Sequence, residues 1–271
     1  MDSESTKKEI AELKDTIKLL NKKLNDSESL KSNFISNIMN EVYNPFSSIM
    51  TLADNIISLD DNNLSRSREM ARFIYKEASK LDFHLQNIFT AATIEAGLED
   101  IDNRTVNINL IHEEVLRKLK IDILSKDIEV VFYKNFSNGD EFVTDPKKLI
   151  LIIINIVSNS IKFSPQGGKI QCNYEMIEDI LNITITDNGS GISGDEMNEI
   201  YDRFKRTTTN INSVTGGTGL GLSVVKALLD MMDGNIEIEN QNGTKVIMSI
   251  PCSAKIDNNM DDSVLFDEEI F

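Results

Sequence analysis

The fold of this chain is decided by the segment Ile180-Leu181-Asn182-Ile183-Thr184-Ile185-Thr186-Asp187-Asn188-Gly189-Ser190-Gly191. Its apolar and polar residues alternate as far as Thr186, which predicts a half-buried strand. The strand is followed by an acid and two glycines, and glycine lets the backbone come close to a ligand. We therefore expect the strand to end at a binding site, where the Asp187 carboxylate can accept a hydrogen bond from an exocyclic amine such as that of adenine.

A second glycine-rich segment, Gly216-Gly217-Thr218-Gly219-Leu220-Gly221, opens a predicted helix from Leu220 to Met232. Backbone N–H groups at the start of a helix attract anions, and glycines allow a polyphosphate to approach them. The segment lacks the Lys-Ser/Thr pair of a Walker P-loop. No strand immediately precedes it, so it is not a Rossmann fingerprint either.

Upstream, an apolar run from Lys148 to Phe163 predicts a helix that follows Asp145-Pro146, a pair typical of a helix start. Asn159 offers a carbonyl oxygen to Mg²⁺, and Lys162, one turn later on the same face, offers a charge to phosphate. Asn155, one turn earlier, supports the metal or its waters, or has a structural role in the helix.

These segments, together with Tyr201-Asp202-Arg203-Phe204, resemble the N, G1, F and G2 boxes of histidine kinases and their ATPase relatives. The resemblance covers roughly residues 31 to 251 and implies binding of ATP with Mg²⁺, the metal held by Asn159 and Asn155. It places the adenine-binding carboxylate at Asp187. Arg203 and Arg206 are phosphate ligands or solvated cations, and Phe163 lies against the adenine or in the core. The residues expected to bind the nucleotide are Asn155, Asn159, Lys162, Phe163, Asp187, Gly189, Gly191, Arg203, Arg206, Gly217, Thr218, Gly219, Leu220 and Gly221.

Residues 34–45, Phe-Ile-Ser-Asn-Ile-Met-Asn-Glu-Val-Tyr-Asn-Pro, resemble the H box of the same family. The place of the phosphoryl-accepting histidine is held by Asn40. Glu41 is retained where the family places a general base, whereas Tyr43 and Asn44 replace the usual Arg and Thr or Asn.

Asn40 removes the nucleophile of the usual autokinase reaction. Its amide nitrogen shares its lone pair with the carbonyl and does not attack phosphorus at neutral pH. The two histidines of the chain, His84 and His112, are interpreted as surface or packing residues. We therefore expect no autophosphorylation at position 40.

Several explanations of Asn40 stay open. The chain is a natural pseudokinase, which the altered Tyr43 and Asn44 favour, or a conventional histidine kinase captured as a His-to-Asn variant. A kinase that uses another acceptor, Tyr43 or a nearby Ser, is a further alternative. So is a non-catalytic dimeric interaction scaffold.

Composition excludes several classes of protein. The net charge of −16 over 271 residues argues against nucleic acid and against an anionic membrane surface as partners. There is no apolar run of 18 residues and no basic, apolar start typical of a signal peptide. Two isolated cysteines suit a reducing compartment. We expect a cytoplasmic protein or a cytoplasmic fragment of a larger or membrane-associated sensor.

Periodicity predicts a helical first half. Apolar residues from Ile10 to Leu24 recur in steps of three and four, so residues 1–30 are expected to form a coiled-coil entry. Residues 31–98 predict a two-helix dimerisation hairpin with a turn near Asp60 and an end near Gly97. Its apolar stripe needs a second copy, which gives a homodimeric four-helix bundle. In the first helix the residues of this stripe are Phe34, Ile38, Val42, Ile49, Leu52 and Ile56. A monomeric hairpin packed on the second domain is the alternative.

The second half predicts an α/β sandwich at residues 110–251, after a polar linker at 99–109, so that the fold class is α+β. Residues 204–216 are expected to form a lid, and the acidic tail 252–271 to be a solvated or docking segment. The family resemblance implies a response regulator or another histidine kinase as partner in a two-component system. The remaining predicted elements are strands Thr105–Leu110, Ile128–Phe136, Lys169–Met176, Ile236–Glu239 and Lys245–Ile250, a helix Ile111–Ser125, and a helix end at Gly234.

Overall fold

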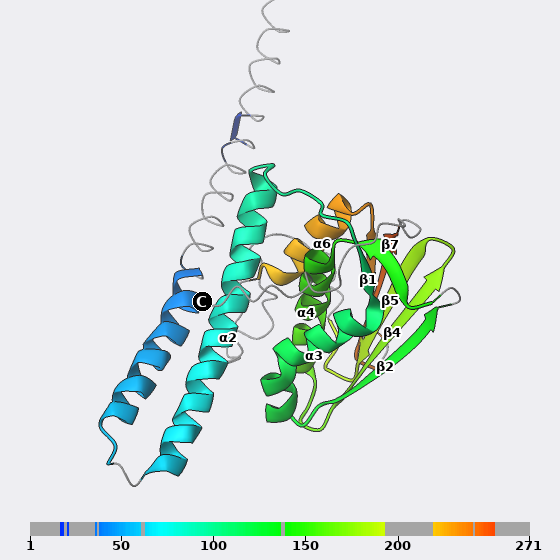
Figure 1. Ribbon diagram of the computed structural model, residues 1–271. Helices are drawn as coiled ribbons and strands as arrows, with labels where there is room; N and C mark the ends of the chain where they lie inside the picture. The colour runs from blue at the N-terminus through cyan, green and yellow to red at the C-terminus, as the bar shows by residue number, and fades with distance from the viewer. Residues whose placement is uncertain are drawn as a thin grey trace, which may run out of the picture. The chain divides into compact units, whose positions relative to one another are not determined.

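The computed structural model describes residues 17, 18, 21, 36, 38–60, 63–136, 139–192, 219–240 and 242–252. The chain divides into two compact units, Met1–Glu99 with Ile192–Lys226, and Asp100–Gly191 with Ala227–Phe271 (Figure 1). Most of the predicted coiled coil, the predicted lid and nearly all of the acidic tail lie outside the described residues.

The first unit contains a helical hairpin, as predicted. Residues 38–57 are helical through Pro45, and α2 (Leu64–Glu95) follows. Gly97, with φ 66°, donates its N–H to the Ile94 carbonyl (3.0 Å), and Leu98 donates to Thr93 (2.9 Å). A left-handed residue with two such backward bonds is a common helix ending, which confirms the expected stop at Gly97.

The first helix of the hairpin carries two apolar stripes. The stripe expected from the sequence is half-buried and consists of Ile38, Val42, Ile49, Leu52 and Ile56. A second stripe, which the sequence analysis did not single out, is exposed and consists of Met39, Tyr43, Phe46, Met50 and Ile57. The second stripe also advances in steps of three, four and seven residues, which is the spacing of a coiled-coil seam.

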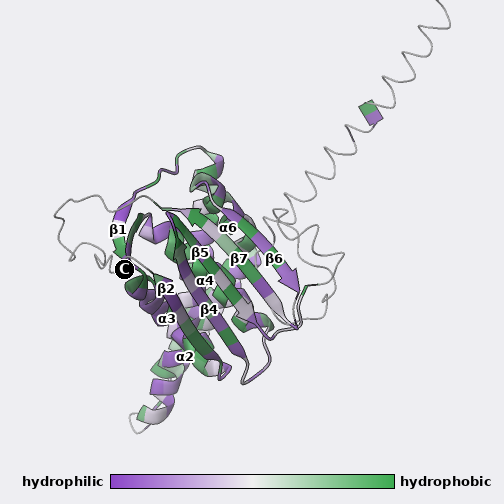
Figure 2. Cartoon of the chain, turned by 90° about the vertical axis from the view of Figure 1, so that its right-hand side faces the viewer, coloured by the Kyte–Doolittle hydropathy of each residue, from purple (hydrophilic) through white to green (hydrophobic). Residues whose placement is uncertain are grey.

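A five-stranded mixed sheet forms the centre of the second unit (Figures 1 and 2). Its strand order is β2-β4-β5-β7-β6, with β2 and β4 parallel and all other neighbours antiparallel. Buried and less buried residues alternate along β5, as the sequence predicted. The strands are β2 (Glu129–Phe136), β4 (Lys169–Ile177), β5 (Ile180–Asp187), β6 (Asn235–Asn240) and β7 (Thr244–Pro251).

Two helices of this unit, α3 (Ile108–Ser125) and α4 (Pro146–Phe163), pack on each other and lie on one face of the sheet (Figure 1). The Asp145 side chain accepts from Lys148 N at 3.1 Å and Pro146 opens α4, so the predicted helix start is confirmed. α4 buries a run of isoleucines, Ile152, Ile153, Ile154 and Ile156. Among the described residues, no helix is both long and apolar enough to cross a bilayer.

Two details differ from the sequence prediction. The strand expected at Thr105–Leu110 is shorter, β1 (Arg104–Asn107), because the Asn107 side chain accepts from Asn109 N (2.9 Å) and starts α3 at once. A strand that was not expected, β3 (Glu141–Thr144), pairs with β1. It is too short to show a period.

Helix α6 (Gly221–Met231) ends before Gly234, as predicted. The left-handed residue of this ending is Asp233, with φ 55°, and Gly234 N donates to the Leu229 carbonyl at 2.7 Å. Gly234 is also required for space, because a Cβ at this position would lie 2.8 Å from the Ser249 carbonyl oxygen of β7.

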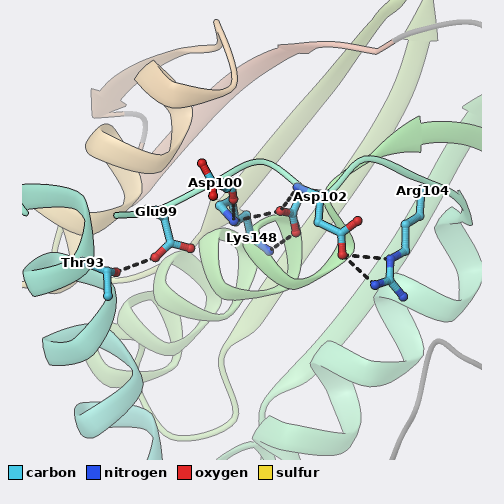
Figure 3. Close-up of polar contacts among 7 residues, drawn as sticks. Thr93, Glu99, Asp100, Asp102, Arg104 and Lys148 are labelled. Carbon is cyan, nitrogen blue, oxygen red and sulfur yellow. Dashed lines mark hydrogen bonds and ion pairs between the residues drawn. The ribbon is translucent and has the colours of Figure 1, made fainter. Parts of the chain in front are cut away.

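A buried ion pair fixes the start of α4 (Figure 3). Lys148 Nζ lies 2.8 Å from Asp145 Oδ2 and 2.6 Å from the Asp100 carbonyl oxygen. The Asp102 N–H donates to the same Asp145 oxygen at 3.0 Å. These hydrogen bonds attach the segment Asp100–Asp102, which was expected to be a linker, to the start of α4.

Lys148→Met should lower the free energy of unfolding by about 3 kcal/mol, because it leaves the Asp145 carboxylate buried without its cation. Urea unfolding of the full chain measures the change. Arg104→Met is the matched control, since it removes the cation of the exposed Asp102 pair and should leave the unfolding curve nearly unchanged. Equal losses in the two variants would contradict the structural role of the Lys148 pair.

Candidate functional site

The Asp187 side chain is held in place at the end of β5. The residue is 6% exposed, and its Oδ1 accepts from Gly189 N at 2.9 Å and from Thr244 N at 3.0 Å. Among the described residues none donates to Asp187 Oδ2. One carboxylate oxygen thus shapes the turn, and the other is able to accept a hydrogen bond.

Close backbone approaches surround this carboxylate. A Cβ at Gly189 would lie 2.9 Å from both Asp187 Oδ1 and the Phe163 carbonyl oxygen, so the turn after β5 touches the last residue of α4. A Cβ at Gly243, in the turn between β6 and β7, would lie 2.1 Å from the Asp187 carbonyl oxygen. Gly191 has φ 71° and lies near the Asn240 side chain. Asp187, Gly189 and Phe163, which the sequence assigned to one site, are therefore brought together.

One face of α4 carries the amide and cationic groups that the sequence predicted as ligands. Asn155 is 3% exposed and donates Nδ2 to the Leu151 carbonyl at 2.9 Å, so its amide nitrogen serves the helix. Asn159, one turn on, is half-buried. Lys162 Nζ lies 5.0 Å from the ring centre of Phe163, a cation–π distance. Phe163 is 45% exposed, so it is not a core residue and presents its ring at the surface.

Lys126, which sequence analysis missed, holds the end of α4. Its Nζ donates to the carbonyl oxygens of Ile161 (2.9 Å), Lys162 (2.7 Å) and Ser164 (2.8 Å). A cation at a helix C-terminus satisfies carbonyls that have no partner inside the helix and opposes the negative end of the helix dipole. Nothing in the sequence pointed to Lys126, because it lies far from α4 along the chain.

Of the remaining predicted site residues, the structure describes three and leaves four outside the described ranges. Gly219 has φ 71°, Leu220 is fully buried, and Gly221 begins α6. The Leu220 carbonyl accepts from Ser223 Oγ at 2.9 Å. Arg203, Arg206, Gly217 and Thr218 lie outside the described residues.

The donor set around α4 suits a hard cation held mainly by oxygen and water. In the described part of the chain no cluster of three or more His, Cys, Asp or Glu side chains could hold a metal. Amide oxygens of Asn155 and Asn159 are ligands that Mg²⁺ accepts, and Mg²⁺ usually keeps several waters and the phosphates of its substrate as further ligands.

The two histidines lie in different surroundings. His112 is 5% exposed, stacks on the Phe132 ring at 4.1 Å between centroids, and lies 3.3 Å from the Tyr174 hydroxyl; burial lowers the pKa of His112 to about 4. Its interpretation as a packing residue is confirmed. On the hairpin, Asn40 is exposed, and Glu41 Oε2 lies 3.3 Å from Nδ1 of His84 on α2.

Comparisons with known proteins show that this chain is similar to histidine kinases. Residues 144–254 match the family of histidine kinase-, DNA gyrase B- and HSP90-like ATPases. Histidine protein kinase 1 of Candida albicans is 30% identical over 236 residues, covering 85% of this chain and 10% of that protein. Sensor-like histidine kinase SenX3 of Mycobacterium bovis is 26% identical over 236 residues, covering 87% of this chain and 57% of that protein.

The fold has a similar solved counterpart. Histidine kinase ThkA, in its complex with the response regulator protein TrrA, superposes with a TM-score of 0.53 at 20% identity, covering 84% of this chain and 64% of that one. In each of the three comparisons, the chain spans less than two thirds of its relative.

Proposed function

The chain belongs to the sensor histidine kinase family, and from this premise we propose that it is the ATP-binding, dimerising core of a cytoplasmic two-component signalling protein. Position 40 of this core does not accept a phosphoryl group. The domain boundaries expected from the sequence remain part of the proposal, with the hairpin at 31–98 and the ATP-binding domain at 110–251.

The observation that carries nucleotide binding is the geometry of Asp187. One carboxylate oxygen is held by two backbone N–H groups, and the second faces no donor among the described residues. A buried acceptor of this kind is satisfied by the exocyclic amine of adenine. Phe163, exposed at the adjacent end of α4, offers a ring surface to a base or to its sugar.

The phosphates and Mg²⁺ fit the same face of α4. Asn159 and Asn155 would hold the metal through their amide oxygens, and Lys162 would supply positive charge to phosphate. The bound nucleotide would supply a phosphoryl group, and the glycines of residues 189–191 and 216–221 would give it backbone N–H donors. Arg203 and Arg206 are proposed as further phosphate ligands.

Asp187→Asn should weaken Mg-ATP binding tenfold or more. The variant keeps an oxygen for the Gly189 and Thr244 N–H groups but replaces Oδ2 by an NH₂ donor, which opposes the adenine amine. Calorimetry and the ATP-dependent rise in melting temperature measure the loss. Asp179→Asn, at the far end of the β4–β5 hairpin, is the control and should bind normally. If calorimetry shows no heat of binding for the unaltered chain with millimolar Mg-ATP, the proposal of nucleotide binding is wrong.

Dimerisation is supported by the exposed stripe of the first hairpin helix. Its five large apolar residues lie at heptad spacing, and a stripe of this kind on a soluble helix indicates a partner surface. α2 adds exposed Tyr75 and Phe89, which lie on one face of that helix. A second copy of the hairpin covers both helices in a four-helix bundle.

Met50→Glu should convert the dimer to a monomer, because it places a charge in the apolar seam. Light scattering should give twice the chain mass for the unaltered protein and the single chain mass for the variant. Asn55→Glu adds the same charge to an exposed position of the same helix outside the stripe and should remain dimeric. A monomeric unaltered chain at micromolar concentration would contradict the bundle.

The inert position 40 is tested by restoring its nucleophile. Asn40→His should gain acid-labile label from γ-labelled ATP at residue 40, located by peptide mapping, with Glu41 available to take the imidazole proton. Asn40→Gln is the control, because its amide is as unreactive as that of asparagine, and it should gain none. If Asn40→His binds ATP but shows no label at residue 40, position 40 has lost more than its nucleophile, through Tyr43, Asn44 or the surrounding structure.

A response regulator is the proposed partner, or a second histidine kinase. The hairpin has a shallow groove one turn beyond position 40, whose lining includes Asn44, Ser47, Thr51, Phe73 and Glu77. This mixed polar and apolar surface is where we expect a receiver protein to dock.

A further inference from the structure

The C-terminal end of α4 has no backbone closure of its own. A helix often satisfies its last carbonyl groups with N–H groups of the residues that follow, through a glycine in the left-handed conformation. Ser164, at this position, is extended instead, with φ −70° and ψ 150°. Pro165 follows it and has no N–H to donate. The carbonyl groups of the last turn therefore depend on a donor from elsewhere in the chain.

Lys126, at the end of α3, supplies this donor. Its Nζ donates to the carbonyl oxygens of residues 161, 162 and 164 at distances of 2.9, 2.7 and 2.8 Å. Its own carbonyl accepts from Gly167 N at 2.9 Å, so Lys126 holds the chain on both sides of Pro165. An ammonium group has three N–H donors, and all three are used on α4. Lys126 therefore has no donor left for a phosphate.

The Phe163 carbonyl belongs to the same turn but contacts the Asp187 turn instead. A Cβ at Gly189 would lie 2.9 Å from the Phe163 carbonyl oxygen and 2.9 Å from Asp187 Oδ1. Gly189 N also donates to that Asp187 oxygen. The last turn of α4 is thus held between two supports, with Gly189 on one side and Lys126 on the other. Their spacing sets the distance from Phe163 to the Asp187 carboxylate.

We propose that Lys126 is a positioning residue of the nucleotide site and sets the affinity for Mg-ATP through α4 alone. The proposal rests on the proposed function, because Asp187, Lys162 and Phe163 are the groups assigned there to the base and the phosphates. The ammonium holds Lys162 and Phe163 in place before the ligand arrives, and such preorganisation raises affinity. Without it, the last turn of α4 moves relative to Gly189, and the three groups no longer fit one ligand.

Lys126→Met removes the three donors and nearly keeps the length of the side chain. Its dissociation constant for Mg-ATP should rise about tenfold, the loss that corresponds to one well-placed hydrogen bond to a charged group. Calorimetry on the full chain measures it at a temperature where circular dichroism shows both proteins folded. Lys120→Met is the matched control, because it removes the same charge from an exposed position of α3, and it should bind normally.

Salt separates positioning from simple attraction between Lys126 and the phosphates. At about 1 M salt an exposed charge acts over only about 3 Å. The ratio of the two dissociation constants, for Lys126→Met and for the unaltered chain, should persist at this concentration. A ratio that falls to one in high salt indicates long-range attraction and overturns the positioning role.

A fluorescent reporter tests the movement of α4 without any ligand. The chain has no tryptophan, so Phe163→Trp introduces a single one at the end of α4. Adding Lys126→Met should shift the emission maximum of this reporter in the folded, ligand-free protein, whereas adding Lys120→Met should not. A merely structural Lys126 would lower the melting temperature and leave both the emission of the folded protein and the affinity for Mg-ATP unchanged.

The outcomes distinguish this proposal from the proposed function. Unchanged emission, or unchanged affinity for Mg-ATP, in folded Lys126→Met overturns the role given to Lys126. If Lys126→Met does not fold, Lys126→Gln decides by the same two measurements, because it keeps two of the three donors and should change both in the same direction. Failure of the unaltered chain to bind Mg-ATP overturns the proposed function instead, while the emission still decides whether Lys126 positions the end of α4.

Discussion

Helix α4 depends on charges placed at both of its ends, and the candidate site depends on α4. Asp145 and Lys148 pair where the helix begins, out of water, and Lys126 donates to three carbonyls where it ends. Between these two points the helix buries its isoleucines against α3 and the sheet. It also carries Asn155, Asn159 and Lys162, the ligand groups that we propose, at helical spacing on one face. The last turn of the helix then meets the glycine turn after β5. Loss of either charge would move the ligand groups without touching any of them.

The sequence predicted the parts of this site that are local in the chain. Strand β5, its terminal Asp187 and the Asp145-Pro146 helix start each depend on neighbouring residues, and all are found as expected. Lys126 was missed because its contacts cross to the far end of α4. β3 was missed because its four residues are too few to show an alternating pattern. These residues form a strand because β1 pairs with them.

The end of α6 was predicted in place but not in geometry. The sequence placed the helix end at Gly234, where it is found, but Asp233 takes the left-handed conformation and Gly234 provides space beside Ser249. The hairpin gives a similar lesson. One apolar stripe of the first hairpin helix was predicted from its spacing, whereas the exposed second stripe was not. A helix with two apolar stripes differs less in hydrophobicity between its faces, so its spacing pattern is harder to detect. Only the packing of the helices shows which stripe the chain covers itself.

The approach of Gly243 to Asp187 joins two positions that are far apart in the chain. A side chain at residue 243 would overlap the backbone of Asp187, and Thr244 beside it supplies one of the two hydrogen bonds that orient the carboxylate. Residue 243 has no side chain to offer a ligand, yet any replacement would displace the backbone that carries the carboxylate. We therefore expect the β6–β7 turn to be inherited together with the Asp187 turn as one evolutionary unit. A relative that has lost the Asp187 carboxylate still has a backbone carbonyl at this position, so we expect it to keep glycine at position 243.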